Sequence, residues 1–303
     1  MLSTLRQTLV VARANILGLR RRAAISVAMA LSIALSVCVL VGFLAMAAGF
    51  ESVLRNSGSQ SVAVILGGGT NQETGSDISA DAIRALKAMR GAIGVETDAA
   101  GHPLMSDELV QAVALPADAV GAQRSVSLRG MGPAGPGLRD GLVVSEGRMF
   151  RTGAREIAVG AQLAADIPFL SVGSTVRLGA VDWLITGHYT AGGSIFESEI
   201  WTDADALRAA FDRQGQVQTL RLRLTGDGAL DSLNAVLRQG LAVEPLNAVT
   251  EAALYAGQSA RTADMIRLFG WPVAILMAFG ATAGALNTMM SSVSDRTVEI
   301  ATL

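Results

Sequence analysis

The sequence AAISVAMALSIALSVCVLVGFLAMAAGF occupies residues 23–50 and contains no charged side chain. A second uncharged stretch, LFGWPVAILMAFGATAGALNTMMSSVS, occupies residues 268–294. A transmembrane helix needs about 20 apolar residues to cross roughly 30 Å of hydrocarbon, whereas a buried helix in a soluble protein uses about 10–14. We therefore predict two membrane-spanning helices, at residues 23–50 and 268–290, with a long segment between them.

The composition of the whole chain agrees with this interpretation. Of 303 residues, 50% are hydrophobic and only 17% are charged, and the mean hydropathy is +0.42. A soluble globular chain carries about 25% charged residues, and a disordered chain carries more charge and fewer apolar residues. The single cysteine, Cys38, excludes a disulfide framework and a zinc site built from cysteines. The single lysine, Lys87, follows a leucine, so the chain has no Gly-Lys-Ser/Thr phosphate loop for ATP.

The distribution of charge along the chain predicts its orientation in a membrane. Residues 1–22 carry five arginines and no acid, whereas residues 51–267 carry 18 Lys/Arg and 24 Asp/Glu. Positively charged flanks stay in the cytoplasm, and long loops cross the membrane largely regardless of their charge. We therefore expect a multi-pass protein of the inner (plasma) membrane, with both termini cytoplasmic and residues 51–267 extracytoplasmic.

The N-terminal segment has two further features. In residues 1–22, apolar side chains recur at spacings of three and four while arginines recur every seven on another face. This pattern predicts a cytoplasmic amphipathic helix on the inner leaflet, with a plain extension of the first span as the alternative. The triplet Ala45-Met46-Ala47 has the form of a signal-peptidase site. Because the apolar run is about twice the usual 7–15 residues of a signal peptide, an uncleaved anchor is favoured.

Alternating and periodic apolar residues predict the elements of the segment between the spans. Predicted strands and helices occupy residues 61–66, 80–90, 93–98, 110–115, 124–129, 156–159, 175–178, 181–189, 203–211, 217–224, 228–239 and 241–245. The strand with the clearest alternation places Leu220, Leu222 and Leu224 on one face and Arg221 and Arg223 on the other.

The order of these elements predicts an α+β domain of two lobes. Each end of the segment reads as a strand–helix–strand unit, whereas its middle is dominated by strands. We expect a first lobe made from residues 51–140 and 215–247, with a β-rich lobe of residues 141–214 inserted into it. From residue 248 the sequence becomes helical again, which predicts a stalk helix over residues 248–267 that continues into the second span.

Residue patterns that would support catalysis are weak in this segment. The run GMGPAG at residues 130–135 has the spacing G-x-G-x-x-G, but Pro136 and Gly137 follow where a dinucleotide site needs the start of a helix. We therefore interpret it as a loop. Gly67-Gly68-Gly69 likewise opens into a polar connection rather than a helix, and no Gly-x-Ser-x-Gly occurs.

The other candidate residues are histidines and acids. His102 and His188 lie far apart without metal-ligand spacing, so a satisfied or exposed histidine is favoured over a metal site that combines His188 with Glu197 and Glu199. The acid pairs Asp107-Glu108 and Asp203/Asp205 are interpreted as turn and cap residues. We expect a domain that binds or moves rather than an enzyme, with no cofactor, metal or nucleic acid.

Small residues in the two spans predict helix packing. Gly280 and Gly284 form a G-x-x-x-G pattern, and Ser32 and Ser36 have the same spacing. Small side chains let helix backbones approach closely in lipid, where packing replaces the hydrophobic effect. Asn287, the amide near the inner end of the second span, is predicted to bond to a neighbouring helix.

Several stretches resemble the permeases of MacB/FtsX/LolC-type ABC transporters. They are NILGLRRR at residues 15–22, LVVSEGRMFRTGAREIAVG at 142–160, GSTVRL at 173–178, WLITG at 183–187, IW at 200–201 and LNTMMSSVSDRTVEI at 286–300. The last is the sharpest, because it is similar to the family's N-T-M, then S-V, then acid-Arg-Thr-x-Glu-Ile run after the second span. The middle stretches are similar to the family's periplasmic core domain.

The resemblance implies a non-catalytic permease subunit with a large periplasmic domain between its first two spans. A separate cytoplasmic P-loop ATPase subunit would drive it, and ATP hydrolysis would move the periplasmic domain to export or extract a lipophilic or peptide substrate. Further partners would be a second permease copy or homologue, the lipid bilayer and, in tripartite members, a periplasmic adaptor protein. Residues 291–303 would touch the ATPase, with the coupling residues Ser294, Asp295, Arg296, Thr297, Glu299 and Ile300.

Two alternatives are weighed against this interpretation. Two spans that bracket an external domain are also the architecture of a sensory receptor, which should continue into a cytoplasmic coiled coil or catalytic module. A membrane-anchored extracytoplasmic enzyme would need no second span. Because the permease family continues into two more spans after its acid-Arg-Thr-x-Glu-Ile run, we expect the present sequence to be the N-terminal portion of a permease.

Overall fold

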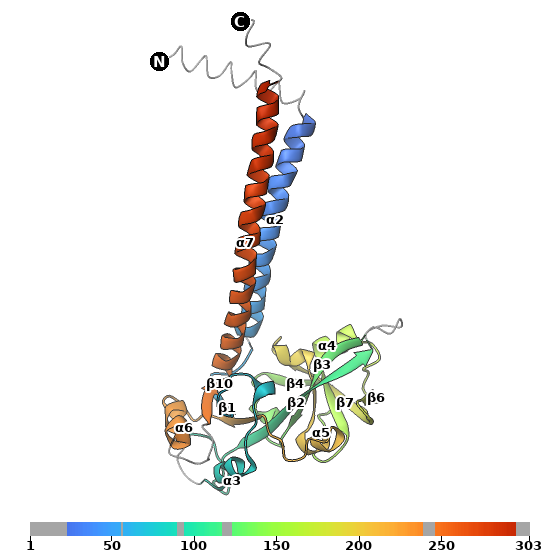
Figure 1. Cartoon of the computed structure of the whole chain (residues 1–303). Coiled ribbons are helices and arrows are strands. Elements are labelled where there is room, and N and C mark those ends of the chain that lie inside the picture. Colours follow the sequence, from blue (N-terminus) through green and yellow to red (C-terminus); the bar gives the residue numbers. More distant parts are fainter. Residues whose placement is uncertain (1–22, 56, 90–93, 117–122, 239–245, 295–303) are drawn as a thin grey trace, which may run out of the picture. The chain divides into compact units, whose positions relative to one another are not determined.

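The chain forms two compact units, which are described separately. The computed structural model describes residues 23–55, 57–89, 94–116, 123–238 and 246–294 (Figure 1). One unit, called the helix pair below, is formed within Met1–Phe50 and Arg261–Leu303. The other unit, Glu51–Ala260, is called the core domain.

Two long helices pass through the helix pair. They are α2 (Ala23–Arg55) and α7 (Glu251–Ser294). By length and composition both could cross a membrane, because Ala30–Gly49 has a mean hydropathy of 2.5 and Glu251–Asn287 a mean hydropathy of 1.6. The predicted spans lie within these helices. The predicted stalk is corrected at its start, because residues 248–250 belong to a strand and the helix begins at Glu251.

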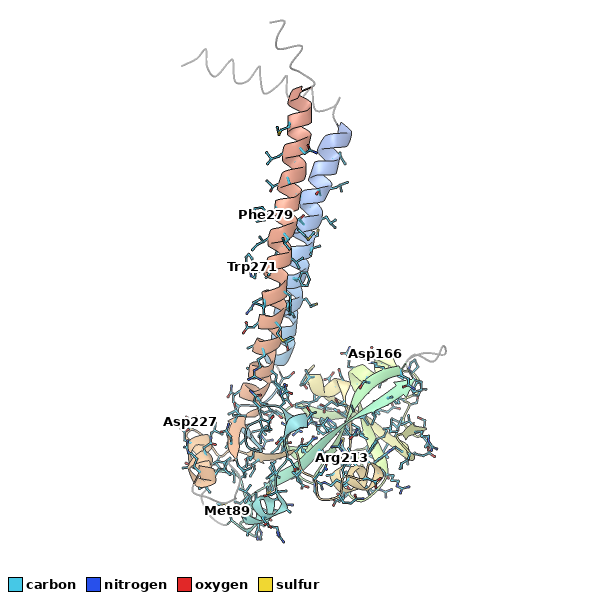
Figure 2. The ribbon with its side chains drawn as sticks, viewed as in Figure 1. Met89, Asp166, Arg213, Asp227, Trp271 and Phe279 are labelled. Carbon is cyan, nitrogen blue, oxygen red and sulfur yellow. The ribbon has the colours of Figure 1, made fainter. Side chains whose placement is uncertain are left out.

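Within the helix pair, α2 and α7 lie side by side and contact each other at small residues (Figure 1). A Cβ atom on Gly270 would lie 3.5 Å from the side chain of Phe43, and Ala47 and Ala263 are both buried. Large apolar side chains such as Trp271 and Phe279 project outward and are 55% and 70% exposed (Figure 2). Apolar outer surfaces around a tightly packed contact are typical of helices in lipid.

The core domain is built on one mixed sheet, which has ten strands in the described residues. The strand order is β10–β1–β9–β2–β3–β8–β5–β7–β4, with β6 paired to β7 as well. The strands are β1 (Val62–Leu66), β2 (Met105–Pro116), β3 (Gln123–Met131), β4 (Leu142–Gly147), β5 (Glu156–Gly160), β6 (Thr175–Leu178), β7 (Val181–Ala191), β8 (Ile200–Asp203), β9 (Thr219–Arg223) and β10 (Asn247–Thr250). The pairs β3–β8 and β5–β7 are parallel, and the other pairs are antiparallel.

Different elements cover the two faces of the sheet. The register sets Leu222 opposite Met105 and Arg221 opposite Ser106, so adjacent residues of a strand point to opposite faces. The face that carries Leu222 packs against α3 (Ala80–Ala88), α4 (Ala161–Asp166), α5 (Ala204–Ala210) and α6 (Ala229–Arg238). The face that carries Arg221 meets the 3-10 turns η2 (Glu73–Gly75), η3 (Pro136–Leu138) and η4 (Ile195–Ser198) and the first turn of α7.

The helix-covered face holds two apolar cores. One joins β1, β9 and β10 to α3 and α6, and the other joins β2, β3 and β5–β8 to α4 and α5. This division corrects the predicted lobes, because Leu109, Val113, Leu115, Val126 and Leu128 belong to the second core although they were assigned to the first lobe. Met105, at the start of β2, packs against the first core. The 12-residue strand β2 spans about 40 Å, so its first residues pair with β9 while most of its length pairs with β3. The two lobes therefore share one continuous sheet.

Most predicted elements of the core domain are present, and three strands were missed. Strand β8 has four buried residues, so the alternation that identifies a half-buried strand is absent. Strand β4 is mostly exposed on both faces, and β10 was assigned to the start of the stalk. The predicted strand at 241–245 lies outside the described residues. Of the predicted strand at 93–98, two isolated bridges at Val95 and Thr97 are present.

We expect Leu233→Ala to destabilise the core domain strongly. Leu233 lies on α6 with no exposed surface, and its truncation removes packing within the core that joins β1, β9 and β10 to α3 and α6. The free energy of unfolding should fall by about 2–5 kcal/mol in urea denaturation of the full chain in detergent. The control, Arg84→Ala at an exposed position, should change it by less than about 0.5 kcal/mol. Equal effects of the two variants would contradict the described core.

Candidate functional site

The residues that the sequence suggested for catalysis have structural partners. The ring of His188 contacts the carbonyl oxygen of Leu170 through Nε2 at 2.7 Å and the carboxylate of Glu146 through Nδ1 at 3.2 Å. Glu197 accepts two backbone N–H bonds, and Glu199 binds an arginine. Among the residues that the structure describes, no three or more His, Cys, Asp or Glu side chains are grouped as a metal site.

The glycine-rich run at residues 130–135 forms a tight turn after β3. The backbone N–H of Gly135 donates to the carbonyl of Gly132 at 2.9 Å. Gly130 lies against α5, where a Cβ would come within 3.0 Å of the Cα of Ala204. The short turn η3 follows at Pro136–Leu138. The glycines therefore serve close packing, in agreement with the interpretation of this run as a loop.

The predicted role of the acid pair Asp203/Asp205 is confirmed for Asp203, whereas that of Asp107-Glu108 is wrong. Asp203 caps α5, because its Oδ1 accepts the N–H of Ala206 at 2.9 Å, as predicted. The assignment of Asp107 and Glu108 to a turn is wrong, because both lie on strand β2. Asp107 pairs with Arg208 of α5 at 2.7 Å, whereas Glu108 points to the opposite face and is completely buried.

Glu108 belongs to a group of seven buried charged residues on the sheet face opposite the four helices. The group, called the ion cluster below, consists of Glu73, Glu108, Arg129, Arg139, Glu199, Arg221 and Glu251. Each is at most 8% exposed. Burying an ionised group is costly unless it is paired and hydrogen-bonded, so the partners of every member matter.

Arg221 of β9 lies at the centre of the ion cluster and has no exposed surface. Its Nε donates to Glu108 at 2.9 Å, and its terminal nitrogens donate to Glu73 of η2 and to Glu251, the first residue of α7. One terminal nitrogen also donates to the hydroxyl of Tyr255 at 3.2 Å. A single guanidinium therefore joins β9, β2, η2 and the start of α7.

The other two arginines tie the rest of the face together. Arg129 of β3 binds Glu199 through two parallel bonds of 2.8 Å and also donates to Glu73 at 2.7 Å and to Glu108 at 3.1 Å. Arg139 donates to both oxygens of Glu108, at 2.9 and 2.7 Å. The Arg129–Glu199 pair is bidentate, with two nitrogens on two oxygens, and such pairs are strong and fix orientation as well as distance. Both bonds from Arg139 come from one terminal nitrogen.

An aromatic ring sits among the three guanidinium groups. The centroid of Phe196 lies 4.9 Å from the guanidinium carbon of Arg139, 5.8 Å from that of Arg129 and 6.0 Å from that of Arg221. The same ring meets Tyr255 of α7 edge to face at 5.8 Å. Cation–π contacts with a buried ring offset part of the cost of dehydrating the arginines.

The arginines lower the pKa of two carboxylates in the cluster, Glu73 and Glu108. Burial raises the pKa of Glu73, but the charges of Arg129 and Arg221 outweigh this effect and lower it to about 2 from 4.5. Burial also raises the pKa of Glu108, and the three arginines around it hold the pKa below its usual value. Burial raises the pKa of Tyr255, so its hydroxyl keeps its proton and donates to Glu73 at 3.2 Å.

The first two turns of α7 belong to the core domain and pack against its other elements through one face of the helix. Glu251, Leu254 and Tyr255 are buried there, at positions i, i+3 and i+4 of the helix. Leu254 packs against Val64 and Leu66 of β1. We call Glu251, Leu254 and Tyr255 the α7 foot. It combines one ionic, one aliphatic and one aromatic contact with the core domain.

The backbone of the chain segment before β1 forms hydrogen bonds with the start of α7. The N–H of Ser59 donates to Glu251 Oε2 at 3.0 Å, and its carbonyl accepts the N–H of Ala252 at 3.2 Å. Gly58 has a φ of +103°, and a Cβ there would come within 2.9 Å of backbone Glu251 and of the Tyr255 ring. Glycine therefore suits this position because it adopts a positive φ without strain and because there is no room for a Cβ atom.

Only part of the predicted coupling segment is described. Ser294 is the last residue of α7. The other predicted coupling residues lie outside the described residues: Asp295, Arg296, Thr297, Glu299 and Ile300.

The residues predicted to pack helices do not mark the α2–α7 contact. A Cβ on Gly280 or Gly284 would meet no described atom within 4 Å, whereas one on Gly270 would meet α2. Ser36 donates its hydroxyl to the carbonyl of Ser32 at 3.0 Å within α2. Asn287 is exposed on α7. A role for Gly280, Gly284, Ser32, Ser36 and Asn287 in packing against other helices stays a prediction.

The sequence did not indicate the ion cluster. Its members come from seven places between residues 73 and 251, so no local spacing connects them. The one available signal was Arg221, which lies between two leucines in a strand. We placed Arg221 on the polar face of that strand, and the structure shows that this face is buried as well.

The fold and the ion cluster together describe one architecture. An α+β domain is inserted in sequence between two long apolar helices, and buried ion pairs join its sheet to the first residue of the second helix. Residues 26–248 match the family of the MacB-like periplasmic core domain, and the chain belongs to this family. The resemblance drawn from the sequence is thereby confirmed. The chain carries the periplasmic core domain of an ABC transporter permease, which is an extracytoplasmic part of a membrane protein.

Two solved structures are similar to the core domain. The extracellular domain of the noncanonic ABC-type transporter YknZ from Gram-positive bacteria is 15% identical, with a TM-score of 0.46 over 62% of this chain and 100% of that chain. The periplasmic region of MacB from Actinobacillus actinomycetemcomitans is 12% identical, with a TM-score of 0.48 over 68% of this chain and 94% of that chain. No curated protein matches the sequence.

We expect Glu108→Gln to be among the most damaging single substitutions in the core domain. It leaves Arg139 without a carboxylate partner and weakens the bonds of Arg129 and Arg221. Removing one partner of a buried pair costs about 3–5 kcal/mol, which calorimetry or urea denaturation would measure. The control is Asp81→Asn, which breaks an exposed ion pair worth about 0–1 kcal/mol. A loss no larger than that of the control would show that the buried pairs do not form.

Acid should weaken the core domain partly through Glu73. Because the pKa of Glu73 is lowered from 4.5 to about 2 in the folded state, its contribution to stability is complete above pH 4.5 and is lost as the pH falls towards 2. The free energy of unfolding should therefore fall less steeply over this range in Glu73→Gln than in the unmodified chain. Parallel pH profiles would contradict the described environment of Glu73.

Proposed function

We propose that this chain is the permease subunit of an ABC transporter or mechanotransmission complex. ATP hydrolysis by a separate cytoplasmic ATPase subunit moves the periplasmic core domain, which exports or extracts a lipophilic or peptide substrate. The observation that carries the proposal is α7, one continuous helix that begins on the ion cluster at Glu251 and ends at Ser294, within the predicted coupling segment of residues 291–303.

The length of α7 supports this role. A helix of 44 residues is about 66 Å long, which exceeds the roughly 30 Å of a hydrocarbon core and leaves several turns outside the membrane. A helix is stiff along its axis because each turn is hydrogen-bonded to the next. A displacement at its cytoplasmic end is therefore passed along the axis to the α7 foot rather than absorbed in a loop.

The proposed placement in the membrane follows from charge and apolarity. Helices α2 and α7 cross the bilayer, residues 1–22 with their five arginines stay in the cytoplasm, and residues 51–267 lie outside. A second permease copy or homologue completes the dimer, and a periplasmic adaptor protein is a further partner in tripartite assemblies. The outward apolar side chains of the helix pair, including Trp271 and Phe279, suit contact with lipid or with other spans.

The proposed subunit performs no chemistry of its own. Its best catalytic candidates are held in structural contacts: His188 by Glu146 and a carbonyl, and Glu199 by Arg129. The ion cluster is buried and satisfies most of its own bonds, so it offers no reactive group to a substrate. The energy for movement therefore comes from the partner ATPase.

We expect the full-length permease to co-purify with a P-loop ATPase subunit encoded beside it. The charged residues Asp295, Arg296 and Glu299 suit an ionic contact with that subunit. Arg296→Glu should reduce the recovered ATPase by about tenfold, which corresponds to roughly 1.4 kcal/mol of binding free energy. The matched control is Arg238→Glu at the end of α6, which should retain full recovery. Recovery of a kinase or a methyl-accepting protein in place of an ATPase would favour a sensory receptor and refute the proposal.

A further inference from the structure

We propose that the α7 foot is a latch: it docks on and releases from the ion cluster as one unit, and Glu251 is the charge that leaves. The inference deepens the proposed function, on which its purpose rests. It adds a discrete step between the movement of the second span and the movement of the core domain. It is carried by the bonding pattern of the cluster and by the few described side chains of residues 251–260 that are buried.

Glu251 accepts the fewest hydrogen bonds from arginine among the four carboxylates of the ion cluster. Among the described contacts, it receives one guanidinium bond, from Arg221, and one backbone N–H bond, from Ser59. Glu108 receives bonds from all three arginines, and Glu199 is held by two parallel bonds from Arg129. Glu251 is therefore the member whose departure disturbs the fewest buried pairs.

The cluster stays balanced after Glu251 leaves. With Glu251 docked, four carboxylates face three guanidinium groups; without it, three carboxylates remain for three guanidinium groups. Arg221 keeps its bonds to Glu73 and Glu108, so no arginine is left without a carboxylate. Loss of Glu108 would instead strand Arg139, whose described carboxylate bonds both go to Glu108. Separating a buried ion pair is usually costly because one of the two charges stays buried without a partner.

Few side chains in the first turns of α7 are buried. Among the residues of 251–260 whose burial the structure describes, the buried ones are those of the α7 foot, Glu251, Leu254 and Tyr255. All three lie on one face of the helix, so they dock or release together. Leu254 packs with Val64 and Leu66 of β1 and with Val249 of β10, and Tyr255 packs with the ring of Phe196. An element with few buried side chains can open without unfolding its neighbours when the buried charges that it leaves behind remain paired.

Hydrogen exchange of the full chain in nanodiscs, followed by mass spectrometry, tests the latch. In the unmodified chain, amides of residues 254–260 should exchange at least roughly 100-fold faster than those of β9, because they open without global unfolding. In Glu251→Gln, exchange in residues 254–260 should rise by roughly another tenfold, while β2, β3 and β9 keep their protection. Exchange of the α7 foot at the same rate as β9 in the unmodified chain would overturn the proposal.

The matched control is Glu199→Gln, the same change in the same cluster away from α7. It breaks the two bonds to Arg129 and should raise exchange in β3 and β8 rather than selectively in residues 254–260. If Glu251→Gln instead exposes the central strands as much as the α7 foot, the cluster and the foot form one cooperative unit and there is no latch. Because neither measurement contains an ATPase subunit, failure of the latch leaves the proposed function standing, and absence of an ATPase partner leaves the latch testable.

Discussion

The guanidinium of Arg221 has no contact with solvent, so its charge must be balanced inside the core domain. Its partners Glu108, Glu73 and Glu251 come from β2, η2 and α7, which are far apart along the chain. One side chain therefore connects all three elements. Apolar residues of the same volume often hold a domain at least as firmly as buried ion pairs, but they form no directional bonds. In this domain one of the directional bonds of the ion cluster goes to Glu251, the first residue of α7.

The two faces of the sheet have separate roles. On one face, apolar cores beneath α3, α6, α4 and α5 account for most of the buried aliphatic surface and hold the strands together. On the other face, arginines, carboxylates and aromatic rings connect the sheet to the start of a long helix. In the proposed function, this polar face is where movement of α7 reaches the sheet.

Local patterns predicted the elements in which apolar and polar residues alternate or recur at helical spacing. The alternation of Leu220 and Leu222 with Arg221 and Arg223 identified β9, and the spacing of Leu233 and Leu237 identified α6. The same reasoning failed for β8, whose four residues are all buried, and for β4, which is mostly exposed, because neither strand shows a clear alternation. It also misassigned Glu108 to a turn, because a charged residue in a fully buried strand is rare unless it is paired and its partners are distant in sequence.

By itself the sequence determined that two uncharged segments flank a long α+β domain, and that the chain resembles ABC transporter permeases. Both conclusions depend on patterns within a few consecutive residues, which hydropathy and motif spacing record. Only the tertiary structure decided that both lobes share one sheet, and that Arg221, Arg129 and Arg139 converge on one buried face. The physical reason is that burial of a charge depends on which distant segments pack around it, and that packing has no local signature.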